Sequence, residues 1–275
     1  MITGITYNGY EIPHGRIRRI EGLDTPPYRV SDSVLAGRSG SRFNNNLADK
    51  RAIIVEFLLY KTSMDSYLDE RAEIFDAFDP EDGENELVIE IDDDETISLN
   101  CVVSDVNLPA RAAEMTYANV QVQLIAYDPT IYSEDIHSQS GILAPTGGGA
   151  TFPLIFPITF ATSTTGEATI YNLGNINACP TLTLTGLLTN PLIRNETTGE
   201  TFQLTYSMGV NDSVVIDMYN RTATLNGATS LLTHIAEGSS WWCLEPGANT
   251  IALTTSSTSD TGTLEITWQD TWSAR

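Results

Sequence analysis

Runs in which apolar and polar residues alternate recur along most of the sequence, and they constrain the fold more than any other feature. The runs at 51–61, 86–92, 96–108 and 117–129 are rich in β-branched residues. In the last run every second residue from Ala118 to Ala126 is apolar, with mainly amide side chains between them. This spacing predicts strands of a sheet that has one apolar and one polar face.

One segment between these runs has helical spacing instead. In SMDSYLDERAEIFDAF (63–78), Thr62 or Ser63 is a suitable N-cap and acids follow in the first turn. Residues three, four and seven positions apart form a predicted apolar stripe, made of Met64, Leu68, Ala72, Phe75 and Phe78. We therefore expect a helix that lies across a sheet and ends before Pro80 and Gly83.

The pattern changes after Tyr132, where a stretch rich in Gly, Ser and Pro shows neither period. Beyond it come short Thr-rich strands separated by Gly, Asn and Pro turns. The prediction is a mainly β protein with a sheet domain carrying one α-helix at 1–132, a linker at 133–152 and a β-sandwich domain at 153–275. We expect the first of these domains to fold, and to form its assembly, without the second.

The segment DSVVIDMYNRTATLNG (212–227) holds an Asp, a Tyr and an Arg within a few positions. Two alternating runs flank the polar turn at Asn220 and Arg221, which is a hairpin signature. Asp217 and Arg221 are accordingly interpreted as solvent-face or turn residues rather than catalytic groups.

The formal net charge is −22, from 14 Lys and Arg against 36 Asp and Glu. Phosphate binding requires clustered basic residues, so no direct, sequence-specific contact with nucleic acid is expected, and an anionic membrane surface would repel the chain. No apolar run reaches the roughly 18 residues needed to span a bilayer, and residues 1–15 do not resemble a signal peptide. Synthesis in a cytoplasm and no membrane insertion are the resulting expectations.

Motifs for catalysis, cofactors and metals are missing from the sequence. The three histidines are scattered, GRSGS (37–41) lacks the spacing of a nucleophile elbow, and the acidic runs at 79–86 and 92–95 do not match a calcium loop. We expect no catalytic, cofactor-binding or metal site; a hydrolase that uses two of the many carboxylates is the weakest alternative. Cys101, Cys179 and Cys243 are far apart, so we expect small buried residues rather than a disulfide framework.

Four tryptophans lie in the second half, at 241, 242, 268 and 272. Aromatic faces stack on sugar rings, so a carbohydrate-binding adhesion module is the main alternative function. The competing interpretation places Trp241 or Trp242 in the core of the sandwich, because aromatic residues supply much of core burial.

Several motifs follow one another in a characteristic order along the chain. In the first half they are ITYNGYEIP, IEGLDTPPYRVSD and AGRSGSRFNNNLADKRAIIVEFLL, the last running into a strand that starts at Arg51. In the second half they are YNLGNINACPTLTLTG, NPLIRNETTGETFQL, DSVVIDMYNRTATLNG and SSWWCLEPGANTIAL. The most specific piece is LEPGANTI, with Pro246, Gly247 and Asn249. In their order and spacing these motifs resemble the distal tail proteins of siphophages, including prophage copies.

This resemblance implies a structural hub at the virion tail tip. It implies a homo-hexameric ring built by an N-terminal β-barrel-plus-helix domain, with a galectin-like β-sandwich outside the ring. The implied partners are the tail tube protein, a tail-associated lysin or tail fibre hub protein, and a receptor-binding protein.

Charge is unevenly distributed in the first half. Residues 1–51 hold eight basic against five acidic residues, whereas residues 62–95 hold fifteen acids against Arg71 alone. A ring joins one patch of each subunit to a different patch of the next, so oppositely charged patches suit every interface. The candidate ring-interface residues are Arg16, Arg18, Arg19, Arg38 and Arg42. The alternative is that these arginines pair within their own subunit.

Overall fold

The computed structural model describes residues 2–92, 95–109, 116–143, 166–257 and 259–275, and it falls into two compact units. Unit 1 comprises Met1–Asp135 and Trp272–Arg275, and unit 2 comprises Ile136–Thr271. The expected mainly β fold is confirmed, and the described residues contain a single α-helix, α1. These limits differ from the predicted ones: a strand, β11 (His137–Leu143), lies within the segment expected to be a linker, and residues 144–165 lie outside the described residues.

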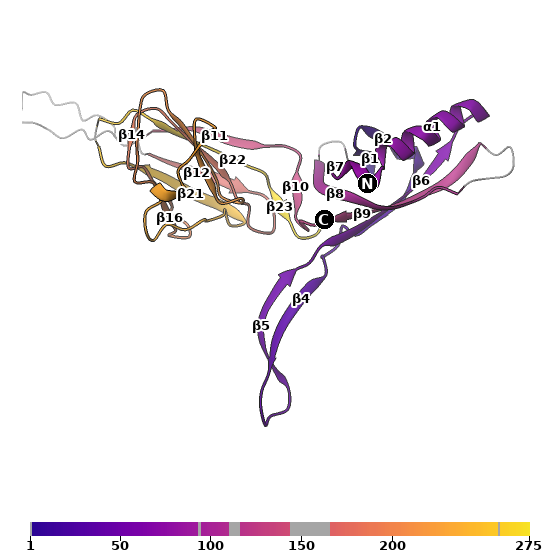
Figure 1. Cartoon of the computed structure of the whole chain (residues 1–275), viewed down its shortest axis with the longest axis horizontal. Coiled ribbons are helices and arrows are strands. Elements are labelled where there is room, and N and C mark those ends of the chain that lie inside the picture. The colour runs from indigo at the N-terminus through magenta and orange to yellow at the C-terminus, as the bar shows by residue number, and fades with distance from the viewer. Residues whose placement is uncertain (1, 93–94, 110–115, 144–165, 258) are drawn as a thin grey trace, which may run out of the picture. The chain divides into compact units, whose positions relative to one another are not determined.

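Unit 1 is built on an antiparallel sheet with the strand order β2-β1-β7-β8-β9-β6-β3, and α1 lies along it (Figure 1). β10 pairs with β8 and with the C-terminal β23. The strands are β1 (Ile2–Tyr7), β2 (Tyr10–Pro13), β3 (Ile17–Glu21), β6 (Arg51–Tyr60), β7 (Glu84–Ile91), β8 (Glu95–Asn107), β9 (Tyr117–Ala126), β10 (Ile131–Ser133) and β23 (Thr271–Trp272), with short 3-10 turns at His14–Arg16 and Pro80–Asp82. The apolar face of β9 is buried as the alternation predicted, since every second residue from Ala118 to Ala126 is at most 1% exposed.

The helix α1 (Met64–Ala77) forms where it was predicted, with Ser63 as N-cap accepting a hydrogen bond from the Ser66 amide. The predicted apolar stripe is wrong for three of its five members, because Leu68 and Phe75 are 52% and 43% exposed and Ala72 is exposed too. Phe78 is buried and Met64 packs against the core, as predicted. The helix instead buries the face that carries Tyr67, Glu70, Ile74 and Ala77. A glutamate sits in the middle of this face, so hydrophobic periodicity alone did not identify it.

The last four residues of the chain belong to unit 1. Trp272 is 7% exposed and joins its core cluster, and the Arg275 amide donates to the Leu23 carbonyl. Arg51 is 1% exposed and donates to the carbonyls of Pro129 and Gly22, and to that of Ser273 at 2.6 Å. A buried guanidinium thus holds three distant segments together through carbonyl acceptors, which satisfies its donors without a carboxylate.

Unit 2 is a sandwich of a six-stranded sheet, β11-β22-β13-β18-β19-β20, and a four-stranded sheet, β12-β21-β15-β16. Besides β11, its strands are β12 (Glu167–Asn172), β13 (Thr181–Thr185), β14 (Leu188–Thr189), β15 (Leu192–Asn195), β16 (Thr201–Gln203), β17 (Ser207–Met208), β18 (Ser213–Asp217), β19 (Thr222–Leu225), β20 (Thr229–Ser230), β21 (Gly247–Thr254) and β22 (Thr263–Trp268), with a 3-10 turn at Leu232–His234. Buried residues of both sheets share one core cluster, as in face-to-face packing.

The hairpin predicted at 212–227 is confirmed as β18 paired with β19. Asp217 caps the turn by accepting hydrogen bonds from the Asn220 amide at 2.8 Å and from its side chain at 2.7 Å. Arg221 lies in the turn with φ 55° and is exposed. The polar cluster is therefore a turn structure.

The interpretation of the cysteines is wrong for two of the three. Cys179 and Cys243 form a disulfide, and only Cys101 is a free buried thiol. An antiparallel bridge between their neighbours, Ala178 and Leu244, places the two Cα atoms 4.1 Å apart. Their separation of 64 residues concealed this pairing in the sequence.

Candidate assembly interface

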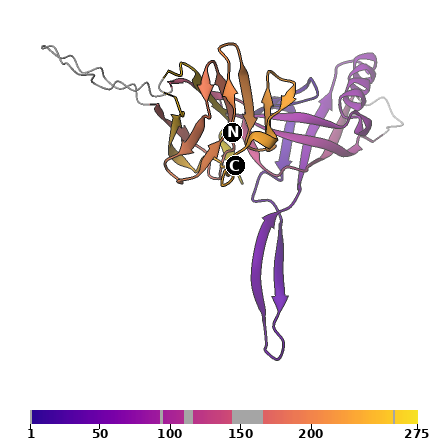
Figure 2. The ribbon, with the colours of Figure 1, turned by 60° about the vertical axis from the view of Figure 1, so that its left-hand side comes forward.

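A two-stranded ribbon, β4 (Tyr28–Val34) and β5 (Ser41–Ala48), extends away from the large sheet of unit 1 (Figures 1 and 2). We call residues 28–48 the arm. Its strands pair only with each other, and every side chain of the two strands except Ala48 is exposed. Isolated two-stranded ribbons are marginally stable in water, so such an arm needs a surface to pack against.

The two faces of the arm differ in chemistry. The register pairs Tyr28 with Ala48, Val30 with Asn46 and Asp32 with Phe43, so alternation places the apolar Tyr28, Val30, Val34 and Phe43 on one face. The polar Asp32, Ser41 and Asn46 share this face. Its four large apolar side chains are 43% to 87% exposed. The opposite face carries Arg29, Arg42 and Leu47, with Arg38 in the turn. The arm is therefore an amphipathic ribbon, with three arginines against Asp32 alone.

The structure separates the five candidate arginines into two groups. Arg16 forms an ion pair with Glu70, and Arg19 forms one with Glu21, both inside unit 1. Arg18, Arg38 and Arg42 are exposed and form no ion pair among the residues that the structure describes. Arg38 and Arg42 belong to the arm, whereas Arg18 lies on β3, so the structure does not gather the five into one patch.

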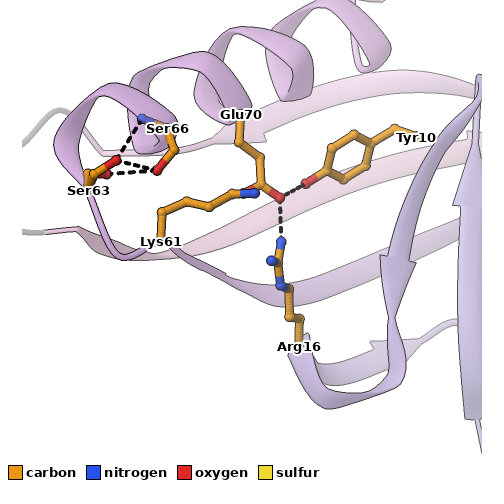
Figure 3. Close-up of polar contacts among 6 residues, drawn as sticks. All are labelled: Tyr10, Arg16, Lys61, Ser63, Ser66 and Glu70. Carbon is orange, nitrogen blue, oxygen red and sulfur yellow. Dashed lines mark hydrogen bonds and ion pairs between the residues drawn. The ribbon is translucent and has the colours of Figure 1, made fainter.

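The Arg16 ion pair is part of a buried polar cluster that fixes α1 (Figure 3). Glu70 is 6% exposed; the Tyr10 hydroxyl donates to its Oε1 at 3.0 Å, and Lys61 Nζ lies 2.9 Å from Oε2. Burial tends to raise the pKa of Glu70, but hydrogen bonds from Lys61, Arg16 and Tyr10 together lower it. Burial and the neighbouring Glu70 raise the pKa of Tyr10. The cluster ties the helix to β2 through Tyr10, to the 3-10 turn His14–Arg16 through Arg16, and to the end of β6 through Lys61.

The outward face of α1 combines apolar and acidic groups. Leu68, Ala72 and Phe75 are exposed, and the Arg71 guanidinium lies 5.1 Å from the centre of the Phe75 ring. Helical spacing places four exposed acids beside these residues, namely Asp65, Asp69, Glu73 and Asp76. No ion pair of the described part of the chain involves these four carboxylates.

A groove of about 610 Å³ lies over the polar face of the unit 1 sheet. Its lining includes Arg18, Glu56, Asn107, Asn119 and Gln121. These groups donate and accept hydrogen bonds, and Phe57, Pro109 and Val120 complete the lining that the structure describes. That described lining contains neither a histidine nor a Ser, Thr, Cys or Lys nucleophile.

The tryptophans do not form a sugar-stacking platform. Trp242, Trp268 and Trp272 are 1%, 9% and 7% exposed, and Trp241 packs its ring 4.8 Å from that of Phe202. The interpretation of Trp242 as a core residue is confirmed. Aromatic recognition of sugars requires an exposed ring face, which the three buried rings do not offer, and Trp241 is only partly exposed.

The histidines make separate contacts: His14 with the Ile2 carbonyl, His137 with Asp270, and His234 with the ring of Tyr206. Among the described residues, no three His, Cys, Asp or Glu side chains are grouped to hold a metal ion. Within the same residues, no helix has the length and apolarity to span a membrane.

Comparison with protein families gives a match to the siphovirus-type tail component, C-terminal domain, over residues 173–272. This segment covers most of unit 2 and runs from within YNLGNINACPTLTLTG to beyond SSWWCLEPGANTIAL. The predicted resemblance to siphophage tail proteins is confirmed.

Solved structures extend the likeness to the whole chain. The crystal structure of SPP1 Dit, titled a paradigm of the hub adsorption apparatus in phages that infect Gram-positive bacteria, has a TM-score of 0.68 at 11% identity, covering 98% of this chain and 99% of that one. Two structures of the activated phage p2 baseplate, with Sr and with Ca, have TM-scores of 0.50 and 0.51 at 10% identity, each covering 97% of both chains. No curated protein sequence matches the chain. At these identities the structures establish a shared fold.

The sequence reasoning did not identify the apolar face of the arm. YRVSDSV (28–34) alternates, but Asp32 and the serines made it resemble a polar surface strand. Pairing β4 with β5, including a shift in register between Ser31 and Asp32, is what places Phe43 with the valines.

Proposed function

We propose that this protein is a non-enzymatic structural hub of a siphophage tail tip, in which six copies close into a ring. Its fold is shared from end to end with SPP1 Dit, which is described as a paradigm of the hub adsorption apparatus. The single observation that carries the ring is the arm, because the large apolar side chains of its first face are exposed in the part of the subunit that the structure describes. In a ring of heterologous contacts each arm covers a surface of the next copy.

The proposed partners follow from a position of the ring between the tail tube and the tail tip. One side of the ring would receive the tail tube protein, and the other would carry a tail-associated lysin or tail fibre hub protein, with a receptor-binding protein attached. The protein would be made in the host bacterial cytoplasm and act in the virion. The strong negative charge suits a passage for DNA, since acidic walls repel phosphate.

The ring-interface proposal is retained for Arg18, Arg38 and Arg42. Arg16 and Arg19 already have carboxylate partners inside unit 1, so their charges are partly neutralised there. A second function as a carbohydrate-binding module is not carried forward, since the tryptophans that suggested it are buried or packed on another ring.

The test is the mass of the purified full-length chain. Six copies of the 30.0 kDa subunit give about 180 kDa. A variant in which Gly and Ser replace residues 29–47 should be monomeric, yet keep the unfolding transition of unit 1. A wild-type chain that stays monomeric at high concentration, alone and with the tail tube protein, would contradict the proposal.

A further inference from the structure

We infer that the arm of one copy docks on the outward face of α1 in the next copy, a surface that we call the ledge: Leu68, Ala72 and Phe75 with the acidic stripe Asp65, Asp69, Glu73 and Asp76. This inference rests on the proposed ring and names the surface that receives the arm.

The ledge exposes large apolar side chains, as surfaces that bind a partner do. Leu68 and Phe75 are two helical turns apart on one side of α1, and both are at least 43% exposed. Arg71 is held against Phe75 and donates to the Leu108 carbonyl at 3.2 Å, so its guanidinium is already engaged. A ribbon that lies on this side of the helix removes apolar side chains of both elements from water.

Charge identifies a second copy as the occupant. The acidic stripe of the ledge is exposed next to its apolar residues. A partner that covers both therefore needs positive charge next to apolar side chains. The arm combines both, with the apolar Val34 and Phe43 on one face, Arg38 in the turn next to them and Arg42 on the other face. Arm and ledge are different surfaces of one chain, which is the requirement for a heterologous contact that repeats around a ring.

The dimensions of the two elements agree. The seven residues of β4 span about 23 Å at the usual rise of a strand, and the fourteen residues of α1 span about 21 Å. The buried Glu70 cluster holds α1 on the sheet, so the ledge is a rigid target. A preorganised surface loses little freedom when the arm binds.

The test is a charge swap in the full-length chain, followed by mass photometry over a range of concentrations at low salt. Arg38→Glu with Arg42→Glu should raise the concentration of half-assembly by about tenfold or more, and Asp69→Lys with Asp76→Lys should do the same. The four substitutions together should restore assembly to within about threefold of wild type, because opposite charges again face each other.

A matched control moves acids elsewhere on unit 1. Glu11→Lys with Glu86→Lys makes the same change in net charge at exposed positions of β2 and β7, and assembly should stay at the wild-type level. Thermal unfolding of each variant checks that the subunit remains folded.

The outcomes separate the two proposals. If the arm variant fails to assemble while the stripe variant assembles like wild type, docking on the ledge is contradicted but the ring is not. The same holds if the combined variant is not rescued. If wild type itself never assembles, both the ring and docking on the ledge are contradicted.

Discussion

The hairpin β18–β19 of unit 2 and the arm of unit 1 are both antiparallel pairs with apolar residues at alternate positions. In β18–β19 the apolar side chains of Val214, Ile216 and Ala223 are fully buried. In the arm, Val30 and Phe43 are each 63% exposed. The difference lies outside the hairpins. A second sheet of unit 2 covers the apolar face of β18–β19, whereas nothing that the structure describes within the subunit covers the apolar face of the arm. Local alternation decides which residues share a face, and the packing of other segments decides whether that face is buried.

The largest effect is expected from removing a covering segment altogether. A chain that ends at residue 135 loses Trp272 from the core of unit 1, and Arg51 loses the Ser273 carbonyl. Losing a buried Trp side chain costs about 3–5 kcal/mol, a large share of a typical domain's stability. We expect this fragment to show no cooperative unfolding transition in calorimetry. This replaces the expectation that residues 1–132 fold alone.

The matched fragment joins residues 1–135 to 272–275 through a short Gly-Ser linker. It restores Trp272 and the acceptor of Arg51, so it should unfold cooperatively. Cooperative unfolding of the fragment ending at 135 would show that the C-terminal residues do not cover the core in the way described.

The next largest effect is expected at the disulfide of unit 2. Replacing Cys179 and Cys243 by Ser should lower the free energy of unfolding of unit 2 by about 2–4 kcal/mol, since the cross-link closes a long loop of the unfolded chain. Reductant added to wild type should reproduce the shift and leave the transition of unit 1 in place. Burial raises the pKa of the Cys101 thiol to about 12, so that thiol should not interfere. Equal transitions with and without reductant would argue against the bond.

A matched pair of substitutions tests the two hairpins directly. Val214→Ala removes two buried methyl groups and should destabilise unit 2 by about 1–3 kcal/mol in denaturant unfolding. Val30→Ala makes the same change on the exposed face of the arm and should alter subunit stability by less than about 0.5 kcal/mol. It should nevertheless weaken assembly. Equal destabilisation by both would mean that the arm is covered within its own subunit.

The smallest effect concerns the Glu70 cluster and depends on pH. Glu70→Gln removes the charge that Arg16 and Lys61 face, and should cost about 1–2 kcal/mol at pH 7. The pKa of Glu70 is lowered in the folded protein, so its contribution is fully present above the unfolded value of about 4.3 and is lost as pH falls through the folded value. Thermal scans of variant and wild type should therefore converge in acid. A gap that stays constant down to acid pH would contradict the role of the charge.

Several features followed from local patterns alone. The buried face of β9, the position of α1, the hairpin at 212–227 and the mainly β fold depend on periods of two or 3.6 residues and on turn and cap residues. The order of motifs also predicted the resemblance to siphophage tail proteins that the match over residues 173–272 supports. These features depend on neighbours within about one turn or one hairpin, so a single sequence contains the necessary information.

Other features were decided only by tertiary structure, because they join residues far apart in the chain. The disulfide depends on the bridge between Ala178 and Leu244, and the return of residues 272–275 to unit 1 depends on the acceptors around Arg51. The buried side of α1 depends on Glu70 meeting Arg16 and Lys61, which makes a charged residue compatible with burial and leaves Leu68 and Phe75 outside. Alternation in the arm was visible in the sequence, but the absence of a cover within the subunit was not, since burial is a property of what packs against a face.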